Sequence, residues 1–510
     1  MNTIIIIFSD AYIESCFNIL RDWNGDSKIG KVVSTETGPS FGSIPIRVDQ
    51  GIRVRPGQML YAPLGSRSSP MDRVCIIRVS TAFEHNPYEE PQTSQIKDMF
   101  GIQALPDGSD LIRKFVVAET EPLEIATLTD NGYVFEPPNL IVPSGTVVYG
   151  NIPEDLANGV LGFPDPSDKN ALILGNVVGS SRTPVTLNAN VVLPRHILIV
   201  GSTGTGKSWL LGKIAEQLHE KGIRMINIDI HGEMNKATEE MGGKIYVPGR
   251  DLRVPLSSLA EPEILGMIPV QHELHIDILT KAVINLKNRN NRFGINDLKS
   301  EAIRVGESYG AKQNTLDIIS ARIDQLAQIP FIGEGIDWKT ALFEGGTIIN
   351  IDCRLMPQSQ LQLVVAAITR DVYNSRRENA IPPLVMAIDE AHLFLPATDK
   401  ADTASVLSQL IKMGRHIALG LILVSQTPGD LDKSITKITN TRFIFAIEPS
   451  ELSSIYGALS DAPPEIVKGI PKMKSGTCLL VGNRETVRHA TVFDVGRRRT
   501  HHGGETPNML

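Results

Sequence analysis

A glycine-rich segment between an apolar run and a helical pattern constrains the fold of this 510-residue chain more than any other feature. The segment reads Gly201-Ser202-Thr203-Gly204-Thr205-Gly206-Lys207-Ser208. Residues 196–200 before it are apolar enough for a buried strand, and a helix is expected to begin after it. Glycines let backbone N–H groups turn inward around phosphates, and the start of a helix adds partial positive charge. The segment therefore predicts a phosphate-binding loop; the alternative is a glycine-rich turn that binds no nucleotide.

The chemistry expected at this loop requires a cation, a hydroxyl and two acids. Lys207 is positioned to reach the terminal phosphates of ATP, and the Ser208 hydroxyl to ligate Mg²⁺. The apolar run 384–388 delivers Asp389 and Glu390 to the carboxyl end of a strand, where α/β sheets bind ligands. Asp389 is predicted to hold Mg²⁺ through water, and Glu390 to orient or deprotonate the attacking water. Alternatively, the two acids are merely solvated.

Three more polar residues end predicted strands near the same place. Gln426 closes the strand 420–425 and is predicted to contact the γ-phosphate or the water, or else to satisfy backbone groups at the strand end. Asp229 and Glu233 follow the strand 224–229 and are predicted to shape the magnesium and water environment. For these two, the alternative is a turn capped by Asp229.

From residue 191 onward, apolar strands alternate with helical stretches, which predicts a mainly parallel α/β sheet. The expected strands are 196–200, 224–229, 346–352, 384–389 and 420–425, and two more at 442–447 and 477–481 extend the sheet. Residues 261–328 form a polar, helix-rich insertion without a strand signal. Together with the glycine-rich loop, this pattern predicts a RecA-like P-loop NTPase core.

The first part of the chain shows a different pattern, in which short β-like runs alternate with turn signals between residues 28 and 80. Such alternation is typical of a small β-barrel or sandwich. Further strands are expected within 114–150, after a loop with one short helix at 86–112. The expected organisation is a β-barrel domain at 1–150, a connection at 151–190, an ATPase domain at 191–495 and a tail at 496–510.

Charge and cysteine content exclude some classes of protein. The net charge of −7 argues against a surface that is basic everywhere, but it permits a local positive lining that grips DNA. The four cysteines, at Cys16, Cys75, Cys353 and Cys478, form no CxxC pair, so neither a disulfide framework nor a zinc module is expected. The apolar start 4–8 is read as a strand, because it is too short for a membrane span. We expect a cytoplasmic protein without membrane association.

Several of these elements occur in an order that resembles the HerA branch of the HerA–FtsK superfamily of DNA-pumping ATPases. Apart from the glycine-rich loop, the matching segments are the barrel at 29–61, the entry 195–199, Asp229-x-His231-Gly232-Glu233, the strand end at 388–392, Gly414-Arg415-His416 and Ser425-Gln426-Thr427. The Asp-x-His-Gly-Glu element is more specific than the P-loop itself. The resemblance implies that the N-terminal barrel is of the HAS type.

The resemblance also implies an activity and partners. It implies a homo-hexameric ring that uses ATP hydrolysis to translocate along or unwind double-stranded DNA. A NurA-type nuclease would dock on this ring for DNA end resection in homologous recombination and repair. Arg415 is similar to the family's arginine finger, which acts on ATP held by a neighbouring subunit. The alternative for Arg415 is a cap at the end of the preceding helix. Arg195 also matches a family arginine, either as an interface contact or as a surface charge.

Two positions depart from the family pattern. Met234 stands where the family often has an aromatic residue, and Met413 where it usually has an acid. These departures leave the core chemistry intact but indicate a divergent branch with an unusual partner. The second hypothesis is therefore a HerA-like ATPase ring that scaffolds an antiphage defence effector. A membrane-anchored conjugation pump is disfavoured, because no transmembrane segment is present.

Contacts to DNA are expected from basic residues in two places. The insertion carries Lys287, Arg289 and Arg292 in a compact basic and amide cluster, which could track phosphates without reading sequence. Lys433 and Lys437, beyond the strand that ends at Gln426, are comparable candidates. The alternative for both groups is an ordinary solvated surface.

Overall fold

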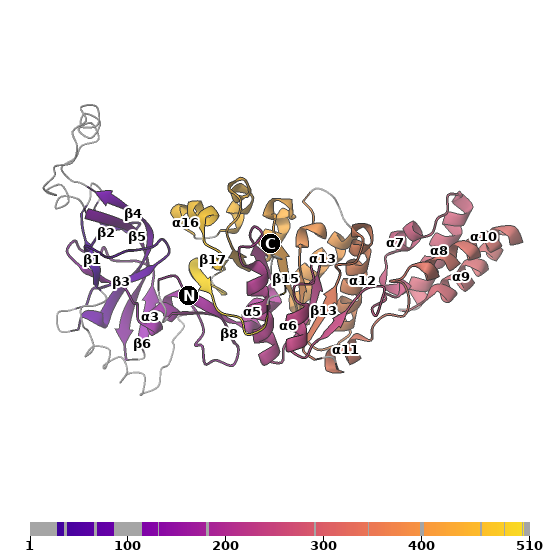
Figure 1. The fold of residues 1–510 in the computed structure, drawn as a ribbon, viewed down its shortest axis with the longest axis horizontal. Helices are drawn as coiled ribbons and strands as arrows, with labels where there is room; N and C mark the ends of the chain where they lie inside the picture. Colours follow the sequence, from indigo (N-terminus) through magenta and orange to yellow (C-terminus); the bar gives the residue numbers. More distant parts are fainter. Residues whose placement is uncertain are drawn as a thin grey trace, which may run out of the picture. The chain divides into compact units, whose positions relative to one another are not determined.

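The structure is a computed structural model. It describes residues 28–34, 38–65, 69–85, 115–130, 132–179, 183–289, 292–344, 346–397, 402–459, 462–483, 485–501 and 503. The expected strand at 4–8 and the expected loop and helix at 86–112 lie outside these residues. The chain divides into two compact units, one made of Met1–Asn188 with Leu459–Gly496 and the other of Ala189–Ala458 with Arg497–Leu510 (Figure 1). The connection 151–188 and the stretch 459–496 therefore group with the N-terminal barrel.

The first unit contains the barrel. Its strands are β1 (Lys28–Val32), β2 (Ile44–Val48), β3 (Met59–Pro63), β4 (Arg73–His85), β5 (Phe115–Thr129), β6 (Gly132–Glu136) and β7 (Val147–Tyr149). They follow the order β2-β1-β7-β3-β4-β5-β6, and an additional antiparallel pairing of β2 with β5 closes the barrel. Alternate apolar residues such as Ile46, Leu60 and Ile77 fill its interior, as the two-residue period of a strand requires. The predicted small β-barrel is confirmed.

The remainder of the first unit consists of α3 (Glu154–Leu161), β8 (Ala171–Val177), β9 (Pro184–Asn188), α16 (Pro464–Gly469), β17 (Thr477–Gly482) and β18 (Thr491–Val495). Strand β18 pairs with β17 and with β8, both antiparallel. Arg78 on β4 is 2% exposed, pairs with Glu121 and donates to the Ala490 carbonyl oxygen. A buried guanidinium is tolerated only when it is paired, so these contacts tie the stretch before β18 to the barrel.

The second unit is built on a parallel sheet. Its strands are β10 (Ile197–Val200), β11 (Arg224–Asp229), β12 (Lys244–Tyr246), β13 (Ile348–Asp352), β14 (Leu384–Ile388), β15 (Leu419–Ser425) and β16 (Thr441–Ile444). They follow the order β12-β13-β11-β14-β15-β10-β16 with parallel pairings. Strands β13, β14 and β15 are buried along their whole length, which explains their continuous apolar runs. Strand β12 was not expected, because its three partly exposed residues form no such run.

The helices of the second unit are α4 (Ala189–Val192), α5 (Lys207–Glu220), α6 (Asn235–Glu240), α7 (Glu261–Met267), α8 (Glu273–Arg289), α9 (Ile295–Ser308), α10 (Gln313–Asp324), α11 (Trp338–Glu344), α12 (Gln358–Arg377), α13 (Asp402–Met413), α14 (Lys433–Ile438) and α15 (Leu452–Ile455). Helices α7 to α10 form the predicted insertion, and α8, α9 and α10 pack together (Figure 1). Ile278 and Ala282 on α8 and Leu298 on α9 are fully buried. Among the helices that the structure describes, none is long and apolar enough to span a membrane.

Candidate active site

The carboxyl ends of the parallel strands meet at one edge of the sheet in the second unit. The register pairs Val200 with Ser425 and Asp229 with Asp352, so β10, β15, β11 and β13 end at matching levels. Strand β14 ends beside β11, and Asp389 follows its last residue. The loop 201–206 and the residues after these strands therefore gather at the edge where α/β sheets bind ligands.

The glycine-rich loop joins β10 to α5 and has the backbone that its sequence predicts. Gly204 and Gly206 have φ angles of +75° and +119°, which favour glycine. The Nζ of Lys207 donates to the Ser202 carbonyl oxygen at 2.9 Å, and Thr205 Oγ1 donates to the same oxygen at 2.7 Å. Burial lowers the pKa of Lys207, while the charges of Glu390, Asp389 and Glu233 act in the opposite direction. At the start of α5, Lys207 thus lies close to three acidic side chains.

Asp389 and Glu390 lie side by side but differ in environment. Burial, together with the charges of Glu390 and Asp229, raises the pKa of Asp389 to about 7. Glu390 is 5% exposed and has a φ of +48°, a left-handed conformation that costs free energy in a residue with a side chain. Backbone strain of this kind is found at sites where a side chain must be aimed.

Gln426 connects the loop to Glu390. Its Nε2 donates to Oε1 of Glu390, and its Oε1 accepts from the hydroxyl of Thr203. Both bonds go to side chains of the site, and not to the backbone groups at the strand end that the alternative called for. His231 Nε2 lies 3.3 Å from the same Oε1, and His392 Nδ1 lies 3.3 Å from Oε2 of Glu390. Oε1 of Glu390 is therefore hydrogen-bonded by Gln426 and His231, whereas Oε2 is buried and has no hydrogen bond among the described residues.

Asp229 organises the turn that follows β11. Its Oδ1 accepts from the backbone N–H groups of His231, Gly232 and Glu233, at 3.2, 2.6 and 3.2 Å. Its Oδ2 accepts from the Met234 N–H at 2.9 Å. Asp229 thus caps the turn. Its negative charge also helps to raise the pKa of Asp389.

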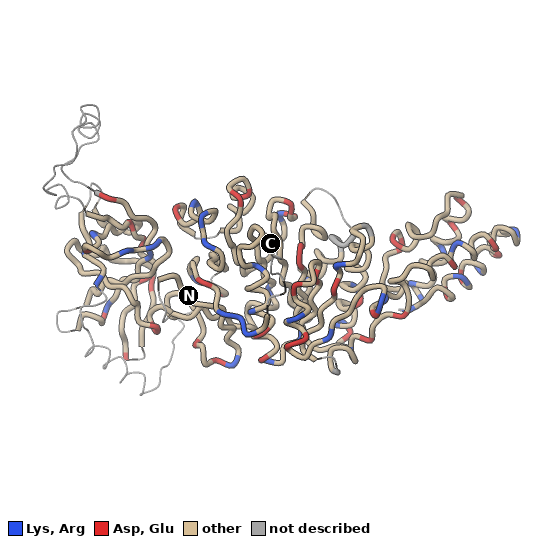
Figure 2. Tube along the Cα trace, in the orientation of Figure 1, with Lys and Arg blue, Asp and Glu red and all other residues tan. Residues whose placement is uncertain are grey.

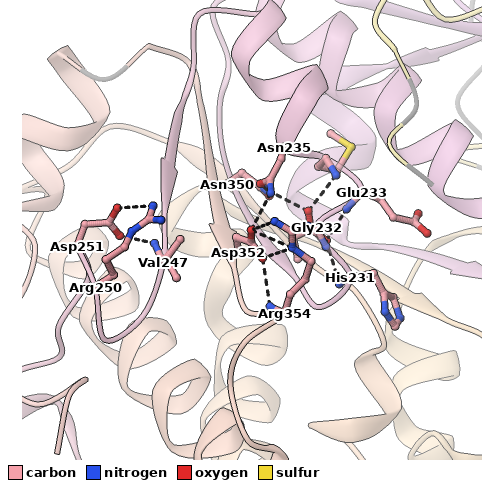
Figure 3. A network of polar contacts seen from close by, with 12 residues as sticks. His231, Gly232, Glu233, Asn235, Val247, Arg250, Asp251, Asn350, Asp352 and Arg354 are labelled. Atoms are coloured by element: carbon pink, nitrogen blue, oxygen red, sulfur yellow. Dashed lines mark hydrogen bonds and ion pairs between the residues drawn. The ribbon is translucent and has the colours of Figure 1, made fainter. Parts of the chain in front are cut away.

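A polar network next to this turn contains residues that sequence reasoning missed (Figure 3). Asn350 donates to Asp229 Oδ2 at 3.0 Å and to Asn235 Oδ1 at 2.7 Å. Asn235 in turn donates to Asp352 Oδ2 at 2.7 Å, and Arg354 binds the same carboxylate. Asp352 ends β13 as Asp229 ends β11, so the rule that identified Asp229 could also have identified Asp352.

The donor atoms of the site suit a divalent cation. His231, Asp389 and Glu390 each place a ligand atom within 4.8 Å of the others, and among the described residues this is the one cluster of its kind. Carboxylate and hydroxyl oxygens are the ligands that Mg²⁺ prefers, and Asp389 with Ser208 would supply them. An imidazole is a poor ligand for Mg²⁺, so His231 is better suited to contact Glu390.

The entry to β10 links the nucleotide loop to the end of α13. His196 is buried, donates from Nε2 to the Ile411 carbonyl oxygen at 2.8 Å and accepts the Leu421 N–H on Nδ1 at 3.1 Å, the tautomer being assigned from these partners. Burial lowers the pKa of His196, which favours this neutral form. Its neighbour Arg195 ends a 3-10 turn, and the Arg195 carbonyl oxygen accepts from the Asn440 N–H at 3.2 Å.

Arg415 stands apart from the other site residues. It lies in the 3-10 turn Gly414–Ile417, directly after α13, and is exposed. Within the described part of the chain, its side chain makes no hydrogen bond or ion pair, to the end of α13 or to any other group. The structure of a single chain therefore does not bring Arg415 into contact with the loop 201–206.

The basic residues predicted to contact DNA differ in whether their side chains are exposed and in whether they already have partners in the chain. Lys287 is half-buried and donates to the Leu259 and Ser257 carbonyl oxygens, at 2.6 and 3.4 Å. Arg289 forms an ion pair with Glu301 at 3.4 Å, whereas Arg292 is exposed. Lys433 and Lys437 are both exposed on α14. Acidic and basic residues are interspersed along the chain, which matches the modest net charge (Figure 2).

Comparisons with known proteins point to one family. The family described as "Helicase HerA, central domain" matches residues 172–372. The DNA double-strand break repair helicase HerA of Sulfolobus acidocaldarius is 23% identical over 372 residues, which cover 66% of this chain and 71% of that protein. The protein of the same name from Sulfurisphaera tokodaii is 23% identical over 365 residues, with the same coverage of 66% and 71%.

The solved structure of VirB4 of Thermoanaerobacter pseudethanolicus is similar in fold. Its TM-score is 0.50 at 14% sequence identity, and the similarity covers 66% of this chain and 98% of that one. The parallel sheet, the glycine-rich loop and the matched central domain agree with each other. The chain is similar to the HerA family over its central domain, and its fold contains a P-loop ATPase core.

Proposed function

We propose that the chain is an ATP-dependent translocase or helicase for double-stranded DNA that works as a homo-hexameric ring. The observation that carries the proposal is the convergence of Lys207, Glu390 and Gln426 at one sheet edge. Gln426 is hydrogen-bonded to Glu390 and to Thr203 of the loop, and Lys207 interacts with the charge of Glu390. The curated relatives named as DNA double-strand break repair helicases support DNA as the substrate. We also propose a cytoplasmic location and a role in recombinational repair, the second supported by the double-strand break repair for which these relatives are named.

The residues divide the work of phosphoryl transfer between them. Lys207 and the N–H groups of the loop 201–206 would bind the phosphates of ATP and offset the charge that develops on them. Bound Mg²⁺, held by Ser208 and Asp389, would neutralise negative charge on the phosphates. Glu390 would accept a proton from the attacking water, and Gln426, bonded to both Glu390 and Thr203, would orient that water.

Arg415 would complete the site from a neighbouring subunit. Its exposed guanidinium makes no hydrogen bond or ion pair among the described residues, so it is available to a second copy of the chain. A cation supplied across an interface stabilises charge in the transition state and couples hydrolysis to the position of the neighbour. Arg195 is proposed to contribute to the same interface.

For DNA, the exposed Lys433, Lys437 and Arg292 are better placed than Lys287, whose ammonium is bonded to backbone carbonyls. Arg289 would have to exchange Glu301 for phosphate. These residues would contact the backbone of the duplex and carry little sequence information. We further propose that the ring docks a NurA-type nuclease for end resection.

The test combines ATPase assays, with and without linear duplex DNA, with mass measurement of the assembly. We expect duplex DNA to stimulate hydrolysis, Lys207→Ala to abolish it, and the mass to be that of six chains. An ATPase that duplex DNA leaves unchanged would contradict the translocase. If nucleotide instead controlled assembly, an ATPase ring that scaffolds an antiphage effector would be favoured.

A further inference from the structure

The turn after β11 is covered by Arg354, which follows the neighbouring strand β13. Gly232 has a φ of +74°, and a Cβ added there would overlap the Nε, Cδ and Cζ atoms of Arg354. The guanidinium stem of Arg354 therefore packs directly on the backbone of Gly232. Figure 3 shows Arg354 beside Gly232 and bonded to Asp352. This close approach is possible only because position 232 has no side chain.

Arg354 is itself fixed by Asp352. Its Nε donates to both carboxylate oxygens, at 3.0 and 3.1 Å, its Nη2 donates to Oδ2 at 2.7 Å, and its backbone N–H donates to Oδ1 at 3.1 Å. Asp352 is 5% exposed. Burial acts to raise its pKa, but hydrogen bonds from Arg354 and Asn235 hold the pKa below its ordinary value. The pair is thus charged and bidentate, the geometry in which an arginine holds a fixed position best.

The turn 231–234 is consequently held from two sides. Asp229 binds its four backbone N–H groups from within the sheet edge, and Arg354 covers it at Gly232. Asn235, the residue after the turn, is anchored to Asp352 and Asn350. A turn held in this way has little freedom to move its side chains relative to β13 and β14.

His231 is the residue of this turn that reaches the reacting groups. Its ring is half exposed, and its Nε2 lies 3.3 Å from Oε1 of Glu390. Among the described residues, Glu390 is the one hydrogen-bond partner of the His231 side chain, so the backbone that carries His231 sets this distance. The position of His231 against Glu390 therefore depends on the turn, and the turn depends on Arg354.

We propose that Arg354 and Asp352 form a positioning pair that holds the Gly232 turn and thereby sets His231 against Glu390 during ATP hydrolysis. The inference rests on the proposed role of Glu390 in activating water. Arg354 and Asp352 contact neither the P-loop lysine nor Glu390 in the bonds described, so they act through His231 and are not catalytic residues. His231 would fix the orientation of the Glu390 carboxylate that accepts the proton.

The first test is independent of catalysis. Backbone hydrogen exchange, followed by mass spectrometry on peptides that cover residues 229–235, is compared between the full-length wild type and Arg354→Ala. We expect exchange at the Gly232 and Met234 amides to become about tenfold faster or more, because the cover over the turn is lost. Arg250→Ala is the matched control, since Arg250 pairs with Asp251 nearby in sequence but does not touch the turn (Figure 3). Unchanged exchange in Arg354→Ala would overturn the proposal.

The second test is a double-mutant cycle on ATP hydrolysis. Arg354→Ala should lower kcat by about tenfold with KM for ATP within about twofold, because the phosphate loop is untouched. In a His231→Ala background the same substitution should have no further effect, since Arg354 acts through His231. Additive losses, or a loss confined to KM, would overturn the proposal.

Two further variants separate positioning from general damage to the fold. Asp352→Asn should reproduce the kcat loss of Arg354→Ala, and Arg354→Lys should restore it only in part, because an ammonium cannot bind the carboxylate in the same bidentate way. If the wild type hydrolyses no ATP, the proposed function fails, and the hydrogen-exchange comparison still decides whether the pair holds the turn.

Discussion

Two neighbouring residues of the site, Asp389 and Glu390, are proposed to have different roles because their surroundings differ. Asp389 and Glu390 are adjacent in the chain, yet burial and nearby acids raise the pKa of Asp389 to about 7, whereas Glu390 is bonded to Gln426 and approached by His231 and His392. Lys207 is separated from both in sequence and is proposed to bind the phosphates. Substitutions at these positions should therefore fail at different steps.

We predict that Lys207→Ala loses productive ATP binding, while Glu390→Gln keeps binding and lowers hydrolysis by a factor of about 100 or more. Glutamine has the same shape as glutamate, and its carbonyl oxygen can still accept from Gln426. Binding is measured with a fluorescent nucleotide and turnover by phosphate release. Equal loss of binding in both variants would count against the role of Glu390.

The raised pKa of Asp389 predicts a pH dependence with a defined sign. An unperturbed aspartate has a pKa of about 3.9, so protonated Asp389 favours the folded state, and this contribution is lost as the pH rises from about 4 to about 7. Mg²⁺ requires the carboxylate and competes with the proton. The apparent affinity for Mg-ADP should therefore rise about fivefold from pH 6 to pH 7 and about twofold more by pH 8, where it levels off.

Calorimetric titration of Mg-ADP across this pH range checks the prediction. Asp389→Asn serves as the control, because any pH dependence that remains in it belongs to the nucleotide. An affinity of the wild type that is the same at both ends of the range would contradict the assignment of Asp389.

At the scale of elements, the last described residues pack on the helix that begins at the phosphate loop. The Arg498 side chain is fully buried, lies over the Trp209 ring with its Cζ 5.7 Å from the ring centroid, and contacts Glu216 at 3.8 Å. A Cβ at Gly212 would overlap its guanidinium, so helix and arginine are in close contact. Glu216 Oε1 also accepts from the N–H groups of Arg499 and Thr500, at 2.9 and 2.8 Å. These contacts hold α5 at three positions along its length, Trp209, Gly212 and Glu216.

We predict that Arg498→Ala lowers the free energy of unfolding by about 3 kcal/mol, because it removes one cation beside the buried Glu216, which Lys213 Nζ also approaches at 3.9 Å, and opens a gap on α5. The adjacent Arg497 is exposed, so Arg497→Ala is a matched control that should unfold like the wild type. Chemical denaturation followed by fluorescence measures both. Equal stability of the two variants would show that the contacts of Arg498 with α5 contribute little to the free energy of unfolding.

At the scale of the whole molecule, the proposed ring requires residues from two chains at each site. Arg415 and the P-loop lie on the same chain, but no described contact joins them. If Arg415 acts in trans, Arg415→Ala should leave ATP binding intact and lower hydrolysis by a factor of about 1000 or more. Lys412→Ala, an exposed cation one turn earlier, is the matched control and should remain active.

Mixing Arg415→Ala chains with Lys207→Ala chains locates the site. Some interfaces would then join an intact P-loop to an intact arginine, so two inactive parents should yield partial ATPase activity. Mixed rings that assemble, as native mass measurement would show, and remain inactive would argue that Arg415 acts within its own chain or supports the fold.

The sequence by itself determined the features that are encoded locally. The glycine spacing of residues 201–206, the buried strand runs and the helical insertion could all be read because period and backbone preference depend on near neighbours. Only the tertiary structure decided which distant residues meet. It joined Arg354 to Gly232, it satisfied Lys287 with backbone carbonyls, and it grouped residues 459–496 with the barrel. These outcomes depend on strand order and side-chain packing between segments far apart in the chain, which no local pattern records.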